Sequence, residues 1–199
     1  MIAPRAPELV LASTSRYRRE LLARLVPDFR VVAPDVDETP LADEAPLALA
    51  VRLAEAKALA VAKATPGAIV VGSDQVAELD GRPVGKSGSR DAAIAQLVAS
   101  SGKTIAFHTA IAVADTRSSP VAIRAACDRT EVVFRTLSAE EIARYVDREN
   151  PIDCAGSFKA EAAGIALFER IRSEDPTALI GLPLIALAKL LRAAGFTLP

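Results

Sequence analysis

The chain has 199 residues, a hydrophobic fraction of 51% and a net charge of −1, which exclude a disordered chain and favour a folded protein with a sizeable core. A general nucleic-acid or membrane-surface binder would carry more positive charge, so any site for a polyanion must be local. Because only 4% of the residues are aromatic, the core must consist mainly of Ala, Val, Leu and Ile.

Metal chemistry and location are also limited by the composition. One histidine and two cysteines argue against a zinc site, so a bound metal should be a hard cation held by carboxylates, Mg²⁺ or Mn²⁺. The apolar run before Arg16 has no secretory-signal pattern, and the uncharged stretch 176–188 is too short to span a bilayer. We therefore expect a cytosolic (cytoplasmic) protein with free thiols and with no membrane or nucleic-acid partner.

The first half of the sequence predicts alternating strands and helices. A buried strand is expected over 8–12, a helix over 15–25 and a short strand over 30–33. After an acidic, proline-rich loop, a helix begins at Pro46 and continues to 64. An apolar strand follows over 68–73, and Asp80-Gly81 indicates a hairpin turn.

The second half predicts an antiparallel region. A helix is expected over 91–99, followed by two long strands over 104–115 and 121–134 that pair as a hairpin. A capping box at 138–141 begins a helix that reaches about 147, and a loop with Gly156 and Gly164 follows. The last helix is expected over 182–194 and ends at Gly195. These elements predict one α/β domain over 1–199, with a mixed twisted sheet and flanking helices.

Residues 13–19 form the first candidate site, where a strand leads into a helix. Arg16, Arg18 and Arg19 lie in the first helical turn, where the helix dipole is already positive and extra positive charge is unfavourable unless an anion is bound. Hydroxyl groups, free amides and guanidinium groups together suit phosphate. A solvated basic helix start would give the same pattern.

Two acidic residues are the next candidates. Asp74 follows the apolar strand 68–73, and ligands of open α/β sheets bind beyond the carboxyl ends of strands, so Asp74 is a candidate general base or metal ligand. Glu38, in the acidic loop, is a candidate ligand for a hard cation. The alternatives are a turn residue at Asp74 and an ordinary acidic loop around Glu38.

Two lysines and the histidine are less specific. Lys57 lies beside the apolar stripe of the helix 46–64, and it either faces a ligand or extends from the buried edge to solvent. The segment 81–87 is similar to a phosphate-binding P-loop, but Asp80 stands where that motif needs Gly, and the segment follows a hairpin turn. We reject the P-loop and keep Lys86 as a possible phosphate ligand. His108 lies in an apolar strand and is expected to be structural.

Short motifs recur in order along nearly the whole chain. They are LVLASTS (9–15), VDETP (36–40), AEAK (54–57), GSDQV (72–76), GK (85–86), CAGSFK (154–159), DPT (175–177) and GLPLI (181–185). In this order and spacing they resemble the Maf family of nucleotide pyrophosphatases. The resemblance implies a cleft between two lobes, hydrolysis of a nucleoside triphosphate between its α- and β-phosphates, a divalent cation and a homodimer.

The resemblance also implies roles for single residues. Asp74 matches the proton acceptor, and Glu38 and Asp74 match the metal site. The positions that line the phosphate and metal site correspond to Ser13, Arg18, Glu38, Lys57 and Lys86. Arg16 and Ser87 stand where the family commonly has proline, and neither change removes a proposed catalytic group.

Asp74-Gln75 and the stretch 157–161 resemble the subgroup that acts on 7-methyl-GTP, whose specificity positions match Tyr17, Gln75 and Glu161. The methylated base is cationic, and a cation stacks on an aromatic face with about 0.5–2 kcal/mol. Tyr17 offers such a face, with Phe158 as a second candidate. Glu161 can accept hydrogen bonds from the base N1–H and amino group, and Gln75 can read another edge.

Alternatives to this interpretation stay open. Tyr17 and Phe158 can be packing residues only. The substrate can instead be dTTP, UTP or a modified pyrimidine, as in the other subgroup of the family. The chain can also be a nucleotide-binding protein of septum formation without catalysis.

Overall fold

The computed structural model describes residues 7–198, in which a seven-stranded mixed sheet has the order β2-β1-β3-β5-β6-β7 and β4 pairs with β3 outside this path. Strand β1 (Glu8–Ala12) runs parallel to β2 (Arg30–Val32) and to β3 (Ala68–Leu79). The remaining pairs are antiparallel. The predicted mixed α/β sheet is therefore confirmed.

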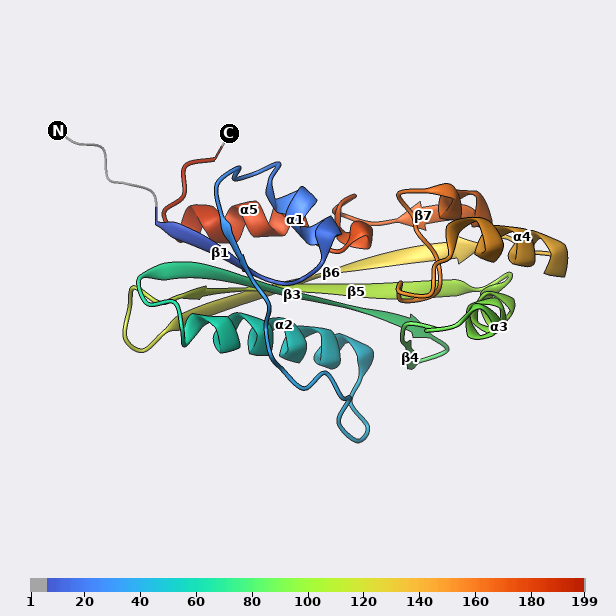
Figure 1. Cartoon of the computed structure of the whole chain (residues 1–199), viewed down its shortest axis with the longest axis horizontal. Coiled ribbons are helices and arrows are strands. Elements are labelled where there is room, and N and C mark those ends of the chain that lie inside the picture. Colours follow the sequence, from blue (N-terminus) through green and yellow to red (C-terminus); the bar gives the residue numbers. More distant parts are fainter. Residues whose placement is uncertain (1–6, 199) are drawn as a thin grey trace.

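The long strands of the sheet connect two lobes (Figure 1). These strands are β3, β5 (Thr104–Asp115) and β6 (Ala122–Phe134). One lobe carries β1, β2 and the helices packed on them. The other carries β4 (Arg82–Val84), β7 (Phe168–Arg172) and the two helices beside them.

Helices cover both faces of the sheet in the first lobe. Helix α2 (Pro46–Ala62) lies on one face, and α1 (Arg16–Leu22) and α5 (Leu184–Ala193) lie on the other (Figure 1). Alternate residues of each strand face opposite layers: Val70 packs with the α2 residues, whereas Ile69 packs with the α5 residues. This double coverage explains why these strands read as continuous apolar runs.

The second lobe contains most of the aromatic residues. Helices α3 (Arg90–Ser100) and α4 (Ala139–Glu149) pack there, and α4 begins with the predicted capping box. The core of this lobe includes four phenylalanine rings in edge-to-face contact, with ring centroids between 4.8 and 5.6 Å apart. Within residues 7–198, no helix is long and apolar enough to cross a membrane.

Several predicted boundaries were wrong. Strand β3 does not end at 73 but continues to Leu79, because β5 pairs with it as far as Glu78. Helix α1 ends at Leu22, and the last helix begins only at Leu184. The expected loop after α4 contains β7 and two 3-10 helices, η1 (Ala163–Leu167) and η2 (Ala178–Ile180). Strand β7 is mostly exposed and charged, so it lacks the alternation that marks a strand.

The predicted hairpins are confirmed. Asp80 and Gly81 have φ values of 51° and 78° and join β3 to β4, as a two-residue turn of the I′ kind requires. Strands β5 and β6 pair from Asp115 with Ala122 onward.

Gly72 allows α2 to approach β3 unusually closely. A Cβ atom at this position would lie 2.2 Å from the Ala54 carbonyl oxygen and 2.6 Å from the Ala58 nitrogen. Only glycine fits without moving the helix. The close approach brings Lys57 of α2 beside Asp74, two residues beyond Gly72 in β3.

We expect Gly72→Ala to lower the free energy of unfolding by about 1–3 kcal/mol, the usual cost of forcing extra volume into a packed core. Urea unfolding of the purified protein measures this change. Gly85→Ala is the matched control, because a Cβ there would have no heavy atom within 4 Å. Equal stability of the two variants would contradict the close packing of α2 on β3.

Candidate active site

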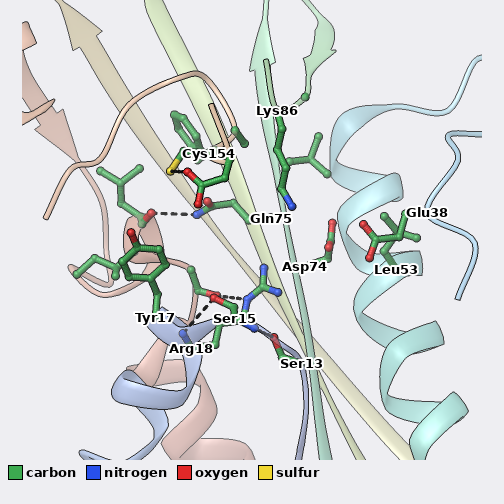
Figure 2. Close-up of a pocket in the computed structure, with 18 of the residues that line it drawn as sticks. Ser13, Ser15, Tyr17, Arg18, Glu38, Leu53, Asp74, Gln75, Lys86 and Cys154 are labelled. Carbon is green, nitrogen blue, oxygen red and sulfur yellow. Dashed lines mark hydrogen bonds between the residues drawn. The ribbon is translucent and has the colours of Figure 1, made fainter. Parts of the chain in front are cut away.

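One cavity of about 830 Å³ lies between the two lobes and brings together every site residue predicted from the sequence. Its lining includes Ser13, Tyr17, Arg18, Glu38, Lys57, Asp74, Gln75, Lys86, Phe158 and Glu161. A cavity of this volume is in the range of small-molecule and cofactor sites. In Figure 2, Asp74, Glu38 and Lys86 lie around one part of the cavity, and Tyr17 and Gln75 lie across from them.

The cavity opens where β1 ends beside β3. Ala12, the last residue of β1, pairs with Gly72, so β3 continues without this neighbour and Asp74 borders open space. The expectation that Asp74 follows the end of its own strand was wrong, because Asp74 lies within β3. It is the carboxyl end of the neighbouring strand β1 that creates the crevice.

Lys57 holds the two predicted carboxylates together. Its Nζ atom lies 2.6 Å from Asp74 Oδ1 and 2.7 Å from Glu38 Oε1. Lys57 and Asp74 are only 5% and 7% exposed, whereas Glu38 comes from an exposed loop. Lys57 therefore does not extend to solvent but places its ammonium group between two acids at the cavity wall.

The donor set of this cluster suits a divalent cation that arrives with phosphate. In the described part of the chain, no group of three or more His, Cys, Asp or Glu side chains comes together. Glu38 and Asp74 nevertheless lie close together, because one oxygen of each carboxylate contacts the Lys57 ammonium group. Each carboxylate has a second oxygen atom. Mg²⁺ typically binds through one or two carboxylates, water and substrate phosphates, so the residues present fit such an ion.

Arg18 reaches the cavity from α1 and is fixed at one end. Ser15 caps α1 by accepting the Arg18 backbone N–H at 3.4 Å, and Ser13 Oγ accepts the Ser15 N–H at 3.1 Å. Arg18 Nε donates to the Gly181 carbonyl at 3.0 Å, which leaves its Nη groups for the cavity. Burial lowers the pKa of the Arg18 guanidinium, and the charges of Asp74 and Glu38 act in the opposite direction.

Lys86 approaches from the other lobe. It follows β4, and its backbone forms an isolated antiparallel bridge with Ala155. Its ammonium group points into the cavity at the same part as Asp74 (Figure 2). The segment 81–87 comprises the end of the β3–β4 turn, β4 and the start of the loop to α3. It follows a hairpin turn, as expected when the P-loop was rejected. The neighbouring Ser87 hydroxyl is buried without a hydrogen-bond partner within 7–198.

Tyr17 and Glu161 both line the cavity, and Tyr17 lies across from Asp74 (Figure 2). Burial raises the pKa of the Tyr17 hydroxyl, and the negative charge of Glu161 adds to this shift, whereas Arg16 opposes it. The Arg16 guanidinium lies over the Tyr17 ring, 4.6 Å from its centroid, and Nη2 donates to the Tyr17 hydroxyl at 2.8 Å. The tyrosine ring therefore already accommodates a positive group on one face.

Phe158 and His108 have structural roles. Phe158 is 5% exposed and makes edge-to-face contacts with Phe107, Phe134 and Phe168, so it is a packing residue with little ring surface left for a base. His108 is buried on β5, with Nε2 2.6 Å from Glu78 Oε2, and does not line the cavity. This is the structural role that the sequence predicted for His108.

Sequence reasoning missed the residues that support the site from behind. The Gly181 carbonyl accepts hydrogen bonds from Arg18 and from the fully buried Ser73. Asp175 accepts the backbone N–H groups of Thr177 and Ile185 at 3.0 and 2.6 Å, and so caps α5 from outside it. Ser73, Asp175 and Gly181 lie in the motifs GSDQV, DPT and GLPLI, but these motifs assigned the three residues no supporting role by themselves.

The comparisons with known proteins agree in length and in family. A family model described as Maf-like protein matches residues 8–194. A 7-methyl-GTP pyrophosphatase of Xanthomonas oryzae pv. oryzae is 58% identical over 193 residues, covering 97% of this chain and 100% of that protein. A protein of the same name from Aromatoleum aromaticum is 55% identical, covering 98% and 100%. One from Cupriavidus metallidurans is 50% identical, covering 96% and 94%.

We expect Lys57→Met to destabilise the protein, because Asp74 would be left buried without its cation. Removing one partner of a buried ion pair costs about 3–5 kcal/mol, and water in the cavity will reduce this figure. Adding Asp74→Asn should recover part of the loss in urea unfolding. Lys103→Met is the control: its pair with Asp80 is exposed, so it should cost less than about 1 kcal/mol. Equal losses for the two lysines, or no recovery, would contradict this account.

Proposed function

This chain belongs to the Maf family, and we propose that it is a metal-dependent pyrophosphatase that hydrolyses 7-methyl-GTP to 7-methyl-GMP and pyrophosphate. The observation that carries the proposal is the division of the cavity. A buried lysine between two carboxylates lies at one part, and Tyr17 and Gln75 lie across from it (Figure 2). Glu161 lines the same cavity and is near enough to Tyr17 to raise the pKa of its hydroxyl. The substrate in the names of the similar proteins supports the same choice. Both cysteines are free thiols, which fits a cytoplasmic location.

The triphosphate is proposed to bind at the carboxylate part of the cavity. Arg18, Lys57 and Lys86 approach it from three different elements and offset its negative charge, and Ser13 contributes a hydroxyl group. Mg²⁺ or Mn²⁺ held by Glu38 and Asp74 would stabilise the charge on the phosphate oxygens and acidify bound water. The cations and the metal together serve as the preorganised electrostatic environment that phosphoryl chemistry needs.

Asp74 is proposed as the proton acceptor. It takes a proton from the water whose oxygen forms a bond to the α-phosphorus, while the bond between the α-phosphorus and the bridging oxygen breaks. Pyrophosphate leaves with the electron pair of that bond. Lys57 keeps the Asp74 carboxylate at the cavity wall, and the narrow approach of α2 at Gly72 fixes the lysine in turn.

The base is proposed to bind between Tyr17 and Glu161. A methylated guanine is positively charged, so it gains from the face of the Tyr17 ring and from the Glu161 carboxylate. The Arg16 guanidinium on Tyr17 supports this, because it is a positive planar group in contact with the same ring. A neutral guanine or a pyrimidine lacks the charge and gains less from both residues.

A panel of triphosphates with Mg²⁺ or Mn²⁺ tests the proposal. We expect 7-methyl-GTP to be consumed faster than GTP, dTTP, UTP and ATP, with 7-methyl-GMP and pyrophosphate as the products. If a pyrimidine triphosphate is preferred, the chemistry stands and the base-binding role of Tyr17, Gln75 and Glu161 is wrong. Binding of triphosphate without turnover would replace the enzyme by a nucleotide-binding protein.

The variant Asp74→Asn should keep the fold and lose turnover by about 10²–10⁴, the usual contribution of a positioned base. The rate at saturating 7-methyl-GTP measures the loss, and urea unfolding checks that the variant is folded. Asp80→Asn, in the exposed β3–β4 turn, is the control and should behave like the parent protein. Near-normal turnover of Asp74→Asn would remove Asp74 from its proposed role.

The variant Glu161→Gln should lower the preference for 7-methyl-GTP over GTP by about 5- to 10-fold, because both bases carry the N1–H and 2-amino donors but only the methylated base carries the positive charge that the carboxylate attracts. The ratio of kcat/KM for the two substrates measures this effect. Glu169→Gln on β7, outside the cavity lining, should leave the ratio unchanged. An unchanged ratio in Glu161→Gln would contradict recognition of the base charge by this residue.

A further inference from the structure

We propose that Thr109 is a positioning residue that fixes Gln75 as a hydrogen-bond acceptor toward the base. The base would then be read by two acceptors, Gln75 Oε1 and the Glu161 carboxylate, and the ligand class would be purines that carry a 2-amino group. This inference rests on the proposed function, because it takes the part of the cavity beside Gln75 as the base site.

Three oxygen atoms surround the amide nitrogen of Gln75. Nε2 lies 2.9 Å from Thr109 Oγ1, 3.0 Å from the Ala178 carbonyl oxygen and 3.1 Å from the Leu179 carbonyl oxygen. If the amide were turned over, its carbonyl oxygen would face two backbone carbonyls that have no hydrogen to donate. The chemistry of the three partners therefore determines which end of the Gln75 amide points into the protein.

Thr109 can act only as an acceptor toward Gln75. It is completely buried on β5 and is paired directly with Gln75 across the β3–β5 ladder. Its single hydroxyl hydrogen is used on the Ala178 carbonyl, 3.0 Å away. Only the lone pairs of Oγ1 remain for Gln75, and at this depth water is not available to replace them.

The backbone carbonyls belong to a turn that is itself held in place. Residues 178–181 follow Asp175 and Thr177, and the Thr177 hydroxyl donates to the Leu182 carbonyl at 2.9 Å. Asp175 is 3% exposed and binds the backbone at both Thr177 and Ile185. Two of the three acceptors around Gln75 are therefore carbonyls of an anchored backbone turn, and the third is the buried Thr109 hydroxyl.

A fixed amide gives the cavity a defined preference. With Nε2 bound behind it, Gln75 presents Oε1 to a ligand, and Glu161 presents a carboxylate in the same cavity. Two acceptors complement the N1–H and 2-amino donors of guanine and 7-methylguanine, which lie side by side on one edge of the base. Hypoxanthine lacks the amino group, so it would leave one acceptor without a partner, which is unfavourable in a binding site.

The first test compares 7-methyl-GTP with 7-methyl-ITP, which lacks only the 2-amino group. We expect the parent protein and Thr109→Ser, which keeps the hydroxyl, to prefer 7-methyl-GTP. Thr109→Val has nearly the same shape without the hydroxyl, and its preference should fall by about 3- to 10-fold, the factor for loss of one hydrogen bond. The change should occur in KM more than in kcat, because Asp74 and its neighbours are untouched.

A second measurement examines, without turnover, whether Thr109 fixes the orientation of the Gln75 side-chain amide. In NMR spectra, the Gln75 side-chain amide hydrogens should exchange slowly with water in the parent protein and in Thr109→Ser, and faster in Thr109→Val. The variant Gln75→Glu keeps an acceptor but directs an anion at three oxygen atoms, so we expect its KM for 7-methyl-GTP to rise by at least about 10-fold.

The outcomes separate this inference from the proposed function. If the parent protein prefers 7-methyl-GTP and Thr109→Val keeps both the full preference and slow exchange of the Gln75 amide hydrogens, Thr109 does not fix Gln75. The proposed function then stands. A normal KM for Gln75→Glu would also contradict the fixed orientation of the Gln75 amide. If neither 7-methylated triphosphate is hydrolysed, the proposed function is wrong and this inference is overturned with it.

Discussion

A buried ammonium group between two carboxylates connects the separate parts of the site. Lys57 comes from α2, Asp74 from the middle of β3 and Glu38 from the loop before α2. Burying one unpaired charge would be costly, and the opposite charges offset that cost only when all the groups meet at short distance. The glycine at position 72 makes this possible, because it allows α2 to rest directly on β3. The catalytic part of the cavity therefore depends on helix-to-sheet packing as much as on its charged groups.

Side chains at both parts of the cavity depend on the backbone carbonyls of one turn. The Gly181 carbonyl holds Arg18 and Ser73, and the Ala178 carbonyl holds Gln75 and Thr109. These side chains lie on α1 and on the long strands β3 and β5, while the turn that holds them lies just before α5. A site supported in this way keeps its groups in one orientation before a ligand arrives, which is the requirement for electrostatic catalysis and for reading a base.

Much of this could be predicted from the sequence, because residues with local signals behaved as expected. The capping box before α4 and the Asp80-Gly81 turn are set by short-range chemistry, and both are present. The length of β3 was not predictable from residues 73–75, since polar residues stay in a strand only where a partner such as β5 and a cavity receive them. For the same reason the partner of Lys57 was not readable from its helix, and Thr109 looked like any threonine in an apolar strand.

The most direct test of the account is hydrolysis of 7-methyl-GTP in ¹⁸O-labelled water with Mg²⁺ or Mn²⁺, followed by mass spectrometry of both products. The proposed arrangement places the attacking water beside Asp74 and the α-phosphorus, so it predicts label in 7-methyl-GMP and none in pyrophosphate. Label in pyrophosphate would mean attack at the β-phosphorus. Release of phosphate with 7-methyl-GDP would mean attack at the γ-phosphorus, and either result would contradict the account.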